Sequence, residues 1–164
     1  IGFGQGFQPV CGFNFGAHKY DRVTRGFHFC VRSSSLILLA LAVLGFAFAP
    51  QIIAVFRGDD AEVIRIGALT LRLQCISFPI TGFVVMSNML LQNIAMTLRA
   101  SIVAAARQGL FFVPFALVLP HFFGLTGVQL CQAASDLCAF VLSICVTVPV
   151  VQQLSEGKNP HDAT

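Results

Sequence analysis

Charge is scarce in this chain, and whole stretches lack it. Asp, Glu, Lys and Arg make up 10% of the 164 residues, hydrophobic residues make up 56%, and the mean hydropathy is +0.81. This composition excludes an ordinary soluble domain. The stretches without any of the four charged residues are 1–17, 33–56, 73–98, 108–135 and 137–155. Because a helix needs about 20 mostly apolar residues to cross ~30 Å of hydrocarbon, we expect these stretches to lie in a membrane.

The sequence also lacks the residue sets of enzymes and metal proteins. It shows no catalytic triad and no paired carboxylates, so no enzymatic activity is expected. Cys131, Cys138 and Cys145 recur on one helical face, but no histidine accompanies them at metal-ligand spacing. We expect the cysteines to pack as small residues, with no metal and no cofactor. Basic loops explain the net charge of +3, so no nucleic-acid partner is predicted.

Five membrane-spanning helices are predicted. The fourth charge-free stretch is too long for one helix, and two glycines at 121–127 break it. The expected spans are about 1–16, 33–56, 68–98, 100–122 and 128–154, followed by a disordered tail at 155–164. Asp59 and Glu62 predict a helix start near Asp60, before the third span. The chain begins inside an apolar stretch without an initiator methionine, so we expect a fragment.

The basic residues predict the orientation of these spans. The first link, the third link and the tail hold Lys19, Arg22, Arg25, Arg32, Arg99, Arg107 and Lys158. The other two links hold Arg57, Arg65 and Arg72, diluted by acidic residues. Because cytoplasmic loops carry the excess of Lys and Arg, the sequence predicts a multi-pass protein of the plasma membrane with a cytoplasmic C-terminus.

Polar residues follow one face of the third predicted span, within an arc of about 60°. They are Thr70, Gln74, Ser77, Thr81, Asn88 and Gln92. Polar side chains that face lipid cost free energy, so this face should point at other helices or at a water-filled cavity. Both alternatives stay open, and all of these residues except Thr70 are candidates for lining a substrate cavity.

The first and fourth predicted spans supply further cavity candidates. Gln5 and Gln8 lie beside Pro9, which removes a backbone hydrogen bond. Phe111 and Phe115 share a helical face beside Pro114, a residue that should kink the helix. Aromatic side chains beside a polar face suit amphipathic or cationic ligands, although aromatic packing against the core or lipid is the commoner role.

Asp136 is the only carboxylate inside a predicted span. A carboxylate in a membrane costs up to ~3 kcal/mol, which makes Asp136 a candidate for coupling transport to Na⁺ or H⁺. The alternative is a hydrogen bond to a neighbouring helix. The structural alternative is favoured, because no basic residue of the chain is expected at the same depth.

Four segments resemble, in order, helices eight, ten, eleven and twelve of multidrug and toxic compound extrusion (MATE) transporters. They are 4–17 with 20–23; 71–73 with Pro79 and Gln92; 107–114; and 124–128 with 134–136. Asn93 departs from the family pattern, which usually has glycine there. The third span also lacks the acidic residue that sodium-coupled relatives carry in the tenth helix.

The resemblance implies a cation-coupled exporter of twelve helices in two lobes, of which this chain would form most of the C-terminal lobe. The implied partners are the lipid bilayer, the N-terminal lobe of the same chain, and small amphipathic or cationic substrates that leave by alternating access. Two alternatives remain: a lipid-linked oligosaccharide flippase of the same superfamily, which should carry more basic residues in its spans, and a membrane scaffold subunit that transports nothing.

Overall fold

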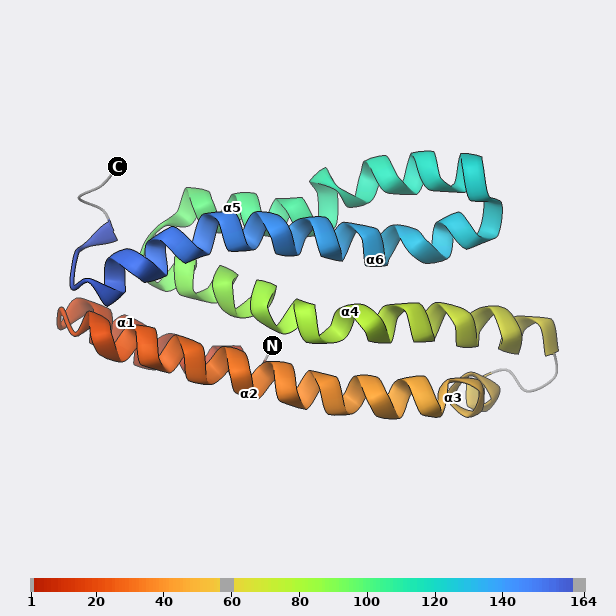
Figure 1. Ribbon diagram of the computed structural model, residues 1–164, viewed down its shortest axis with the longest axis horizontal. Coiled ribbons are helices and arrows are strands. Elements are labelled where there is room, and N and C mark those ends of the chain that lie inside the picture. Colours follow the sequence, from red (N-terminus) through yellow and green to blue (C-terminus); the bar gives the residue numbers. More distant parts are fainter. Residues whose placement is uncertain (1, 57–60, 161–164) are drawn as a thin grey trace.

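The computed structural model describes residues 2–56 and 61–160, and at positions 108, 123, 125 and 126 only the backbone. In chain order the elements are α1 (Gly2–Gly16), α2 (Tyr20–Ala47), α3 (Ala49–Phe56), α4 (Ala61–Asn93), α5 (Thr97–Ala105), the π-helical segment η1 (Ala106–Leu110) and α6 (Phe112–Ser155). All of these elements are helical, which confirms the predicted all-α fold class. The long helices lie side by side along one axis (Figure 1).

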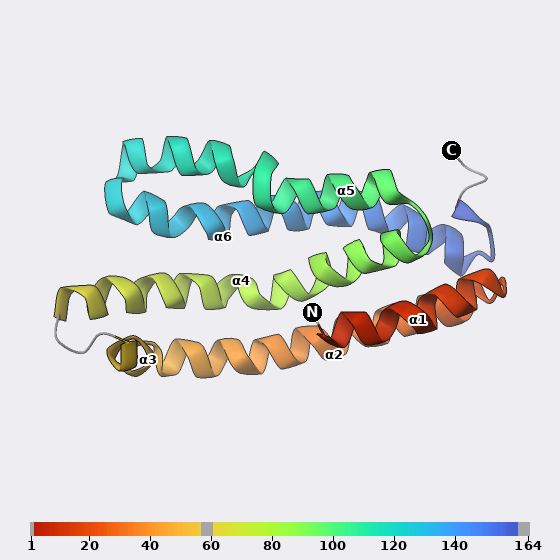
Figure 2. The same cartoon turned by 180° about the vertical axis from the view of Figure 1, so that it is seen from behind.

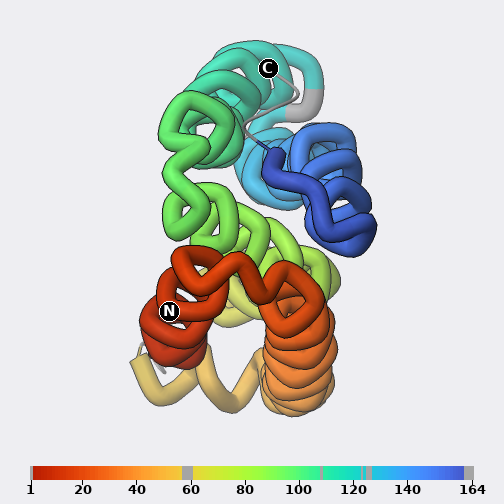
Figure 3. Tube along the Cα trace, turned by 90° about the vertical axis from the view of Figure 1, so that its left-hand side faces the viewer, coloured from red at the N-terminus to blue at the C-terminus, as the bar shows by residue number. Residues whose placement is uncertain are grey.

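Helix α4 is the centre of the molecule, because it contacts every other α-helix. Viewed along the bundle, α1 and α2 lie on one side of α4, and α5 and α6 lie on the other (Figure 3). Leu90, Leu91 and Ile94 at the end of α4 are fully buried. They pack in one cluster with Phe7, Cys11, Val23, Phe27, Val103, Val150 and Leu154 from the surrounding helices. This cluster joins the two sides of the bundle.

Within the described parts of the chain, three helical segments are long and apolar enough to cross a membrane: Tyr20–Ala47, Ala61–Asn93 and Gly127–Ser155. The shorter segment Phe112–Phe122 is also apolar. Large apolar side chains point outward along α2, among them Phe29, Leu36 and Val43. Lipid is the solvent in which such an exposed apolar face is stable, so the helices form a membrane protein.

Helix α2 begins at Tyr20, well before the predicted start near residue 33. Val23 and Phe27 are buried, whereas Arg22, Arg25 and Arg32 are exposed. The buried face of the helix therefore continues beyond the charge-free stretch, and the basic residues occupy the opposite face. Charged residues on an outer helical face do not end a helix, so a prediction based on charge-free stretches makes this helix too short.

The second predicted span, 33–56, is divided at Phe48 into α2 and the short helix α3, which crosses the bundle axis (Figure 1). Pro50 has no backbone N–H, so it cannot donate to the carbonyl of Phe46 one turn earlier. Arg72 of α4 occupies this position instead: its Nε donates to the Phe46 oxygen at 3.4 Å, and its guanidinium lies over the Phe46 ring. A side chain thus replaces the missing backbone donor.

The boundary between the third and fourth predicted spans is also different. Helix α4 begins at Ala61, close to the expected start, although Asp59 and Asp60 themselves lie outside the described residues. It ends at Asn93, and Ala95 turns the chain with a φ of 61° before α5 begins at Thr97. Alanine rarely adopts this conformation, so the sequence gives no glycine or proline signal for the turn.

Helix α6 is a hairpin of two helical arms that lie side by side (Figure 2). Gly124 joins them with a φ of 55° and a ψ of −130°, a conformation that glycine adopts readily. Gly127 begins the second arm against the first: a Cβ atom at this position would collide with the backbone of Leu119 and Pro120. After α6, residues 156–160 form a turn in which Pro160 is buried.

Replacing Gly127 with alanine tests the close contact between the two arms. Gly127→Ala should lower the melting temperature of the detergent-solubilised protein, because backbone atoms cannot move aside as a flexible side chain can. Gly6→Ala is the matched control: nothing lies within 4 Å of a Cβ atom at Gly6. The control should be neutral or stabilising by up to about 1 kcal/mol. Equal effects of both substitutions would contradict the contact.

Candidate functional site

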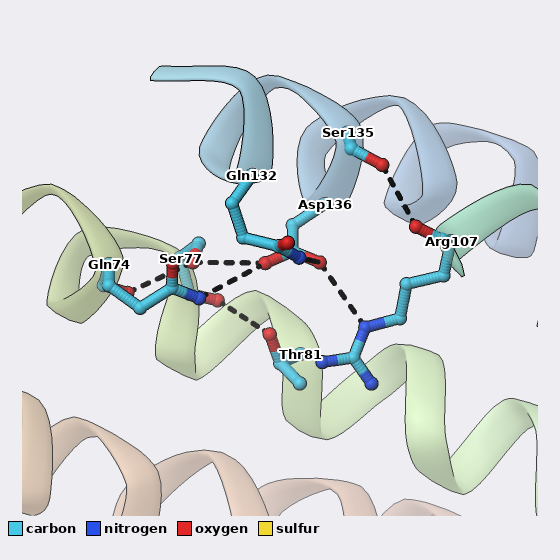
Figure 4. A network of polar contacts seen from close by, with 7 residues as sticks. All are labelled: Gln74, Ser77, Thr81, Arg107, Gln132, Ser135 and Asp136. Atoms are coloured by element: carbon cyan, nitrogen blue, oxygen red, sulfur yellow. Dashed lines mark hydrogen bonds and ion pairs between the residues drawn. The ribbon is translucent and has the colours of Figure 1, made fainter. Parts of the chain in front are cut away.

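Asp136 on α6 is the centre of a buried polar network (Figure 4). Its side chain is only 2% exposed. Oδ1 accepts hydrogen bonds from Arg107 Nε at 3.2 Å and from Gln132 Nε2 at 3.3 Å. Oδ2 accepts from Gln74 Nε2 at 3.5 Å and lies 3.3 Å from Ser77 Oγ, whose single proton is shared between this oxygen and the Gln74 carbonyl at 2.9 Å. We call these five residues the Asp136 network.

The Asp136 network contains a salt bridge that the sequence did not predict. Arg107 was expected at the cytoplasmic end of the fourth span, away from Asp136. Because α5 begins at Thr97, Arg107 lies about 15 Å along the helical path from that end. The expectation that no basic residue reaches the depth of Asp136 is therefore wrong, and its cause is the misplaced boundary between the third and fourth spans.

A π-helical turn carries Arg107. In η1 the N–H of Phe111 donates to the carbonyl of Ala106, five residues earlier, at 3.1 Å. Pro114 lies just beyond η1 and cannot donate to Leu110, so regular helical bonding is already interrupted here. Ser135 of α6 donates its hydroxyl to the carbonyl oxygen of Arg107 at 2.9 Å. The predicted kink near Pro114 thus takes the form of a π-helical turn fixed against α6.

The polar face of α4 divides into two parts with different surroundings. Gln74 and Ser77 bind Asp136, and Thr81 donates to the carbonyl of Ser77 at 3.1 Å, so this part makes contacts between and within helices. Asn88 donates to the carbonyl of Ala100 at 2.8 Å, and Gln92 Nε2 donates to the Asn88 side chain. These two amides lie about two and three turns beyond Thr81 along α4, beside α5.

Asn88 and Gln92 line a pocket of about 210 Å³ between α4 and α5. We call it the α4–α5 pocket. Its complete lining is Val84, Val85, Asn88, Met89, Gln92, Val103, Ala104 and Arg107. Apolar surface with a few polar groups is typical of sites for amphipathic small molecules. One part of the polar face of α4 therefore makes contacts between and within helices, and the other part lines a pocket; that the pocket holds a substrate stays a prediction.

The structure does not bring the other cavity candidates to this pocket. Gln5 is exposed and Gln8 half-buried on α1, and neither is among the lining residues. Phe111 and Phe115 are half-buried just beyond η1 and do not line it either. Arg107 lines the pocket and was not among the predicted site residues. The sequence feature that could have indicated Arg107 is Pro114, seven residues later, because a proline predicts an irregular helix in this part of the chain.

Three buried hydroxyl groups on α4 and α6 lie outside the Asp136 network. Ser87, Ser143 and Thr147 are fully buried, and their hydroxyl groups have no hydrogen-bond partner among the described residues. Leaving such groups unpaired costs free energy, on the order of 1–3 kcal/mol each. The interface of the two longest spans is therefore not packed for stability alone.

An all-helical bundle with helices long and apolar enough to cross a membrane, and with a buried charged pair between them, is typical of a membrane protein. The MatE family model matches residues 1–118 of the 164. The chain therefore belongs to the MatE family of membrane transporters. No curated protein and no solved structure matches the chain significantly.

The unequal burial of the salt bridge predicts unequal effects of breaking it. Asp136 is 2% exposed and Arg107 is 31% exposed. Arg107→Gln leaves a buried carboxylate without its cation and should lower the free energy of unfolding by about 3 kcal/mol. Asp136→Asn leaves a partly exposed guanidinium, and should cost about 1 kcal/mol.

The double variant Arg107→Gln/Asp136→Asn completes this test, with thermal unfolding in detergent as the measurement. It should be more stable than Arg107→Gln alone, because no buried charge is left unpaired. Strictly additive losses would show that the two side chains do not interact in the folded protein.

Proposed function

We propose that the chain belongs to a cation-coupled antiporter, driven by Na⁺ or H⁺, which exports drugs or other xenobiotics of a small, amphipathic kind across the plasma membrane. Family membership supports transport, and the α4–α5 pocket is the observation that carries the proposal for this lobe. Its apolar side chains suit the body of an amphipathic molecule, and Asn88 and Gln92 suit its polar end.

Transport would proceed by alternating access between this lobe and an N-terminal lobe of the same chain. Pro79 inside α4 and the π-helical segment η1 after α5 support such movement, because interrupted helices are the elements that change shape in transporters. The C-terminus would be cytoplasmic, as the exposed basic residues at the start of α2 support.

A lipid-linked oligosaccharide flippase is the second candidate. It was expected to carry basic residues within its spans, and Arg107 occupies such a position beside the α4–α5 pocket. A scaffold subunit without transport is the third, and predicts no directional flux. Flux of a fluorescent amphiphile into proteoliposomes, with and without an imposed Na⁺ or H⁺ gradient, separates these candidates.

Cysteine labelling tests whether the α4–α5 pocket meets water. In a cysteine-free background of the complete transporter, Asn88→Cys and Gln92→Cys should react with a water-soluble thiol reagent. Ile76→Cys is the matched control on the same helix: Ile76 is 64% exposed in the bundle, and we expect it to face lipid. Lys158→Cys should react only after cells are opened, if the C-terminus is cytoplasmic. Equal labelling at Ile76 and Asn88 would contradict the proposal that the α4–α5 pocket is a water-accessible cavity.

Asp136 has either a coupling role or a structural role, and the salt bridge to Arg107 supports the structural one. Asp136→Asn keeps the shape of the side chain and its acceptor oxygen for Arg107. Gradient-driven efflux per folded molecule should therefore be preserved, while protein yield falls. Loss of efflux at normal yield and an unchanged melting temperature would instead assign ion coupling to Asp136.

A further inference from the structure

The α4–α5 pocket contains one charged side chain, Arg107, among the residues that line it. The remaining lining is apolar, apart from two amides that already bond to Ala100 and to each other. The negative charge of Asp136 on α6 is buried among α4, η1 and α6, and Asp136 is not among the residues that line the pocket. A molecule in this pocket therefore meets a guanidinium and no carboxylate.

Arg107 uses only part of its hydrogen-bonding capacity. A guanidinium has five N–H donors, and Asp136 accepts from the single Nε donor. The four donors on the two terminal nitrogens have no partner among the described residues. Figure 4 shows these nitrogens turned away from Asp136 and toward α4. Lipid supplies no acceptors, so only water or a bound molecule in the pocket can accept hydrogen bonds from these donors.

The surrounding groups hold the guanidinium in this orientation. Asp136 cannot turn to follow Arg107, because Gln74, Ser77 and Gln132 also donate to its oxygens. Ser135 holds the backbone of Arg107 through its carbonyl oxygen. The terminal edge of a guanidinium fixed in this way matches the two oxygens of a carboxylate or phosphate, which bind it in a bidentate manner.

We propose that Arg107 binds the carboxylate or phosphate group of an amphipathic substrate in the α4–α5 pocket, and that Asp136 is the positioning residue that aims it. This assignment rests on the proposed transport function and narrows its substrate class. The apolar side chains Val84, Val85 and Val103 would contact the body of the molecule. Cationic amphiphiles would be disfavoured at this pocket, because they would lie against the guanidinium.

Three dansyl probes with the same apolar body test the assignment on the complete transporter in phosphatidylcholine nanodiscs. They are dansylaminoundecanoic acid, its neutral methyl ester, and the cationic dansylaminoundecylamine. Wild-type protein should bind the acid about tenfold more tightly than the ester, the value of one charged hydrogen-bonding contact, after subtraction of empty nanodiscs. Competition by dodecanoate and by dodecyl phosphate then shows which anion is preferred.

Two variants locate this preference. Arg107→Gln/Asp136→Asn removes the guanidinium without leaving a buried charge, and should bind acid and ester equally. Arg99→Gln removes a positive charge from the same stretch of helix but not from the pocket lining, and should keep the preference. If the double variant does not fold, Arg107→Lys provides the same test. It should lose the preference for the acid, because one ammonium group cannot bind Asp136 and also bind the ligand in a bidentate manner.

The assignment is overturned if wild-type protein binds the amine as tightly as the acid, or if the double variant keeps the preference for the acid. Flux of the probes in proteoliposomes is a separate measurement, which tests the transport proposal. No flux of any probe, with the preference intact, would refute the transport proposal and leave Arg107 as an anion-binding residue.

Discussion

The buried charge of Asp136 is the constraint on which the centre of this bundle depends. A carboxylate at 2% exposure inside a membrane protein needs a cation and several donors. Three segments far apart in the sequence meet to supply them: α4 gives Gln74 and Ser77, η1 gives Arg107, and α6 gives Gln132. Apolar packing among helices in lipid specifies register weakly, whereas a buried carboxylate with donors from three segments constrains how those segments are placed. The Asp136 network therefore fixes the relative positions of α4, η1 and α6.

The backbone is adapted to this network rather than the reverse. A regular helix through 106–110 would carry Arg107 in a different direction, since one π-helical turn adds a residue and rotates the rest of the helix. Pro114 has already removed one helical hydrogen bond nearby, which lowers the cost of the irregular turn. The same principle appears at the other end of the molecule, where Pro50 leaves the Phe46 carbonyl without a donor and Arg72 supplies one. In both places a side chain of another helix binds a backbone carbonyl oxygen near a proline: Arg72 binds that of Phe46, and Ser135 binds that of Arg107.

Sequence reasoning reached the fold class, the family and the polar face of α4, because composition and helical periodicity carry that information. It misplaced helix ends wherever the signal was three-dimensional. The basic residues at the start of α2 look like a loop until Val23 and Phe27 are seen to be buried against α1 and α4. The turn at Ala95 has no sequence signal, since an alanine with positive φ is held there by tertiary packing of Ile94 and Met96. Because the end of α4 and the start of α5 were misplaced, Arg107 was assigned to a cytoplasmic link and was not paired with Asp136.

The pairing changes what the polar residues mean. From the sequence, Asp136 is the candidate for ion coupling and Arg107 belongs to a cytoplasmic link. In the structure the carboxylate is fully used by protein donors, whereas the arginine still has free donors and partial exposure toward the α4–α5 pocket. A group whose hydrogen bonds are all satisfied internally has little left to offer a ligand, while a fixed group with unsatisfied donors is arranged to receive one. The chemistry of the site therefore depends on Arg107, whose hydrogen-bonding capacity the salt bridge uses only in part. Asp136 acts by holding Arg107 in position.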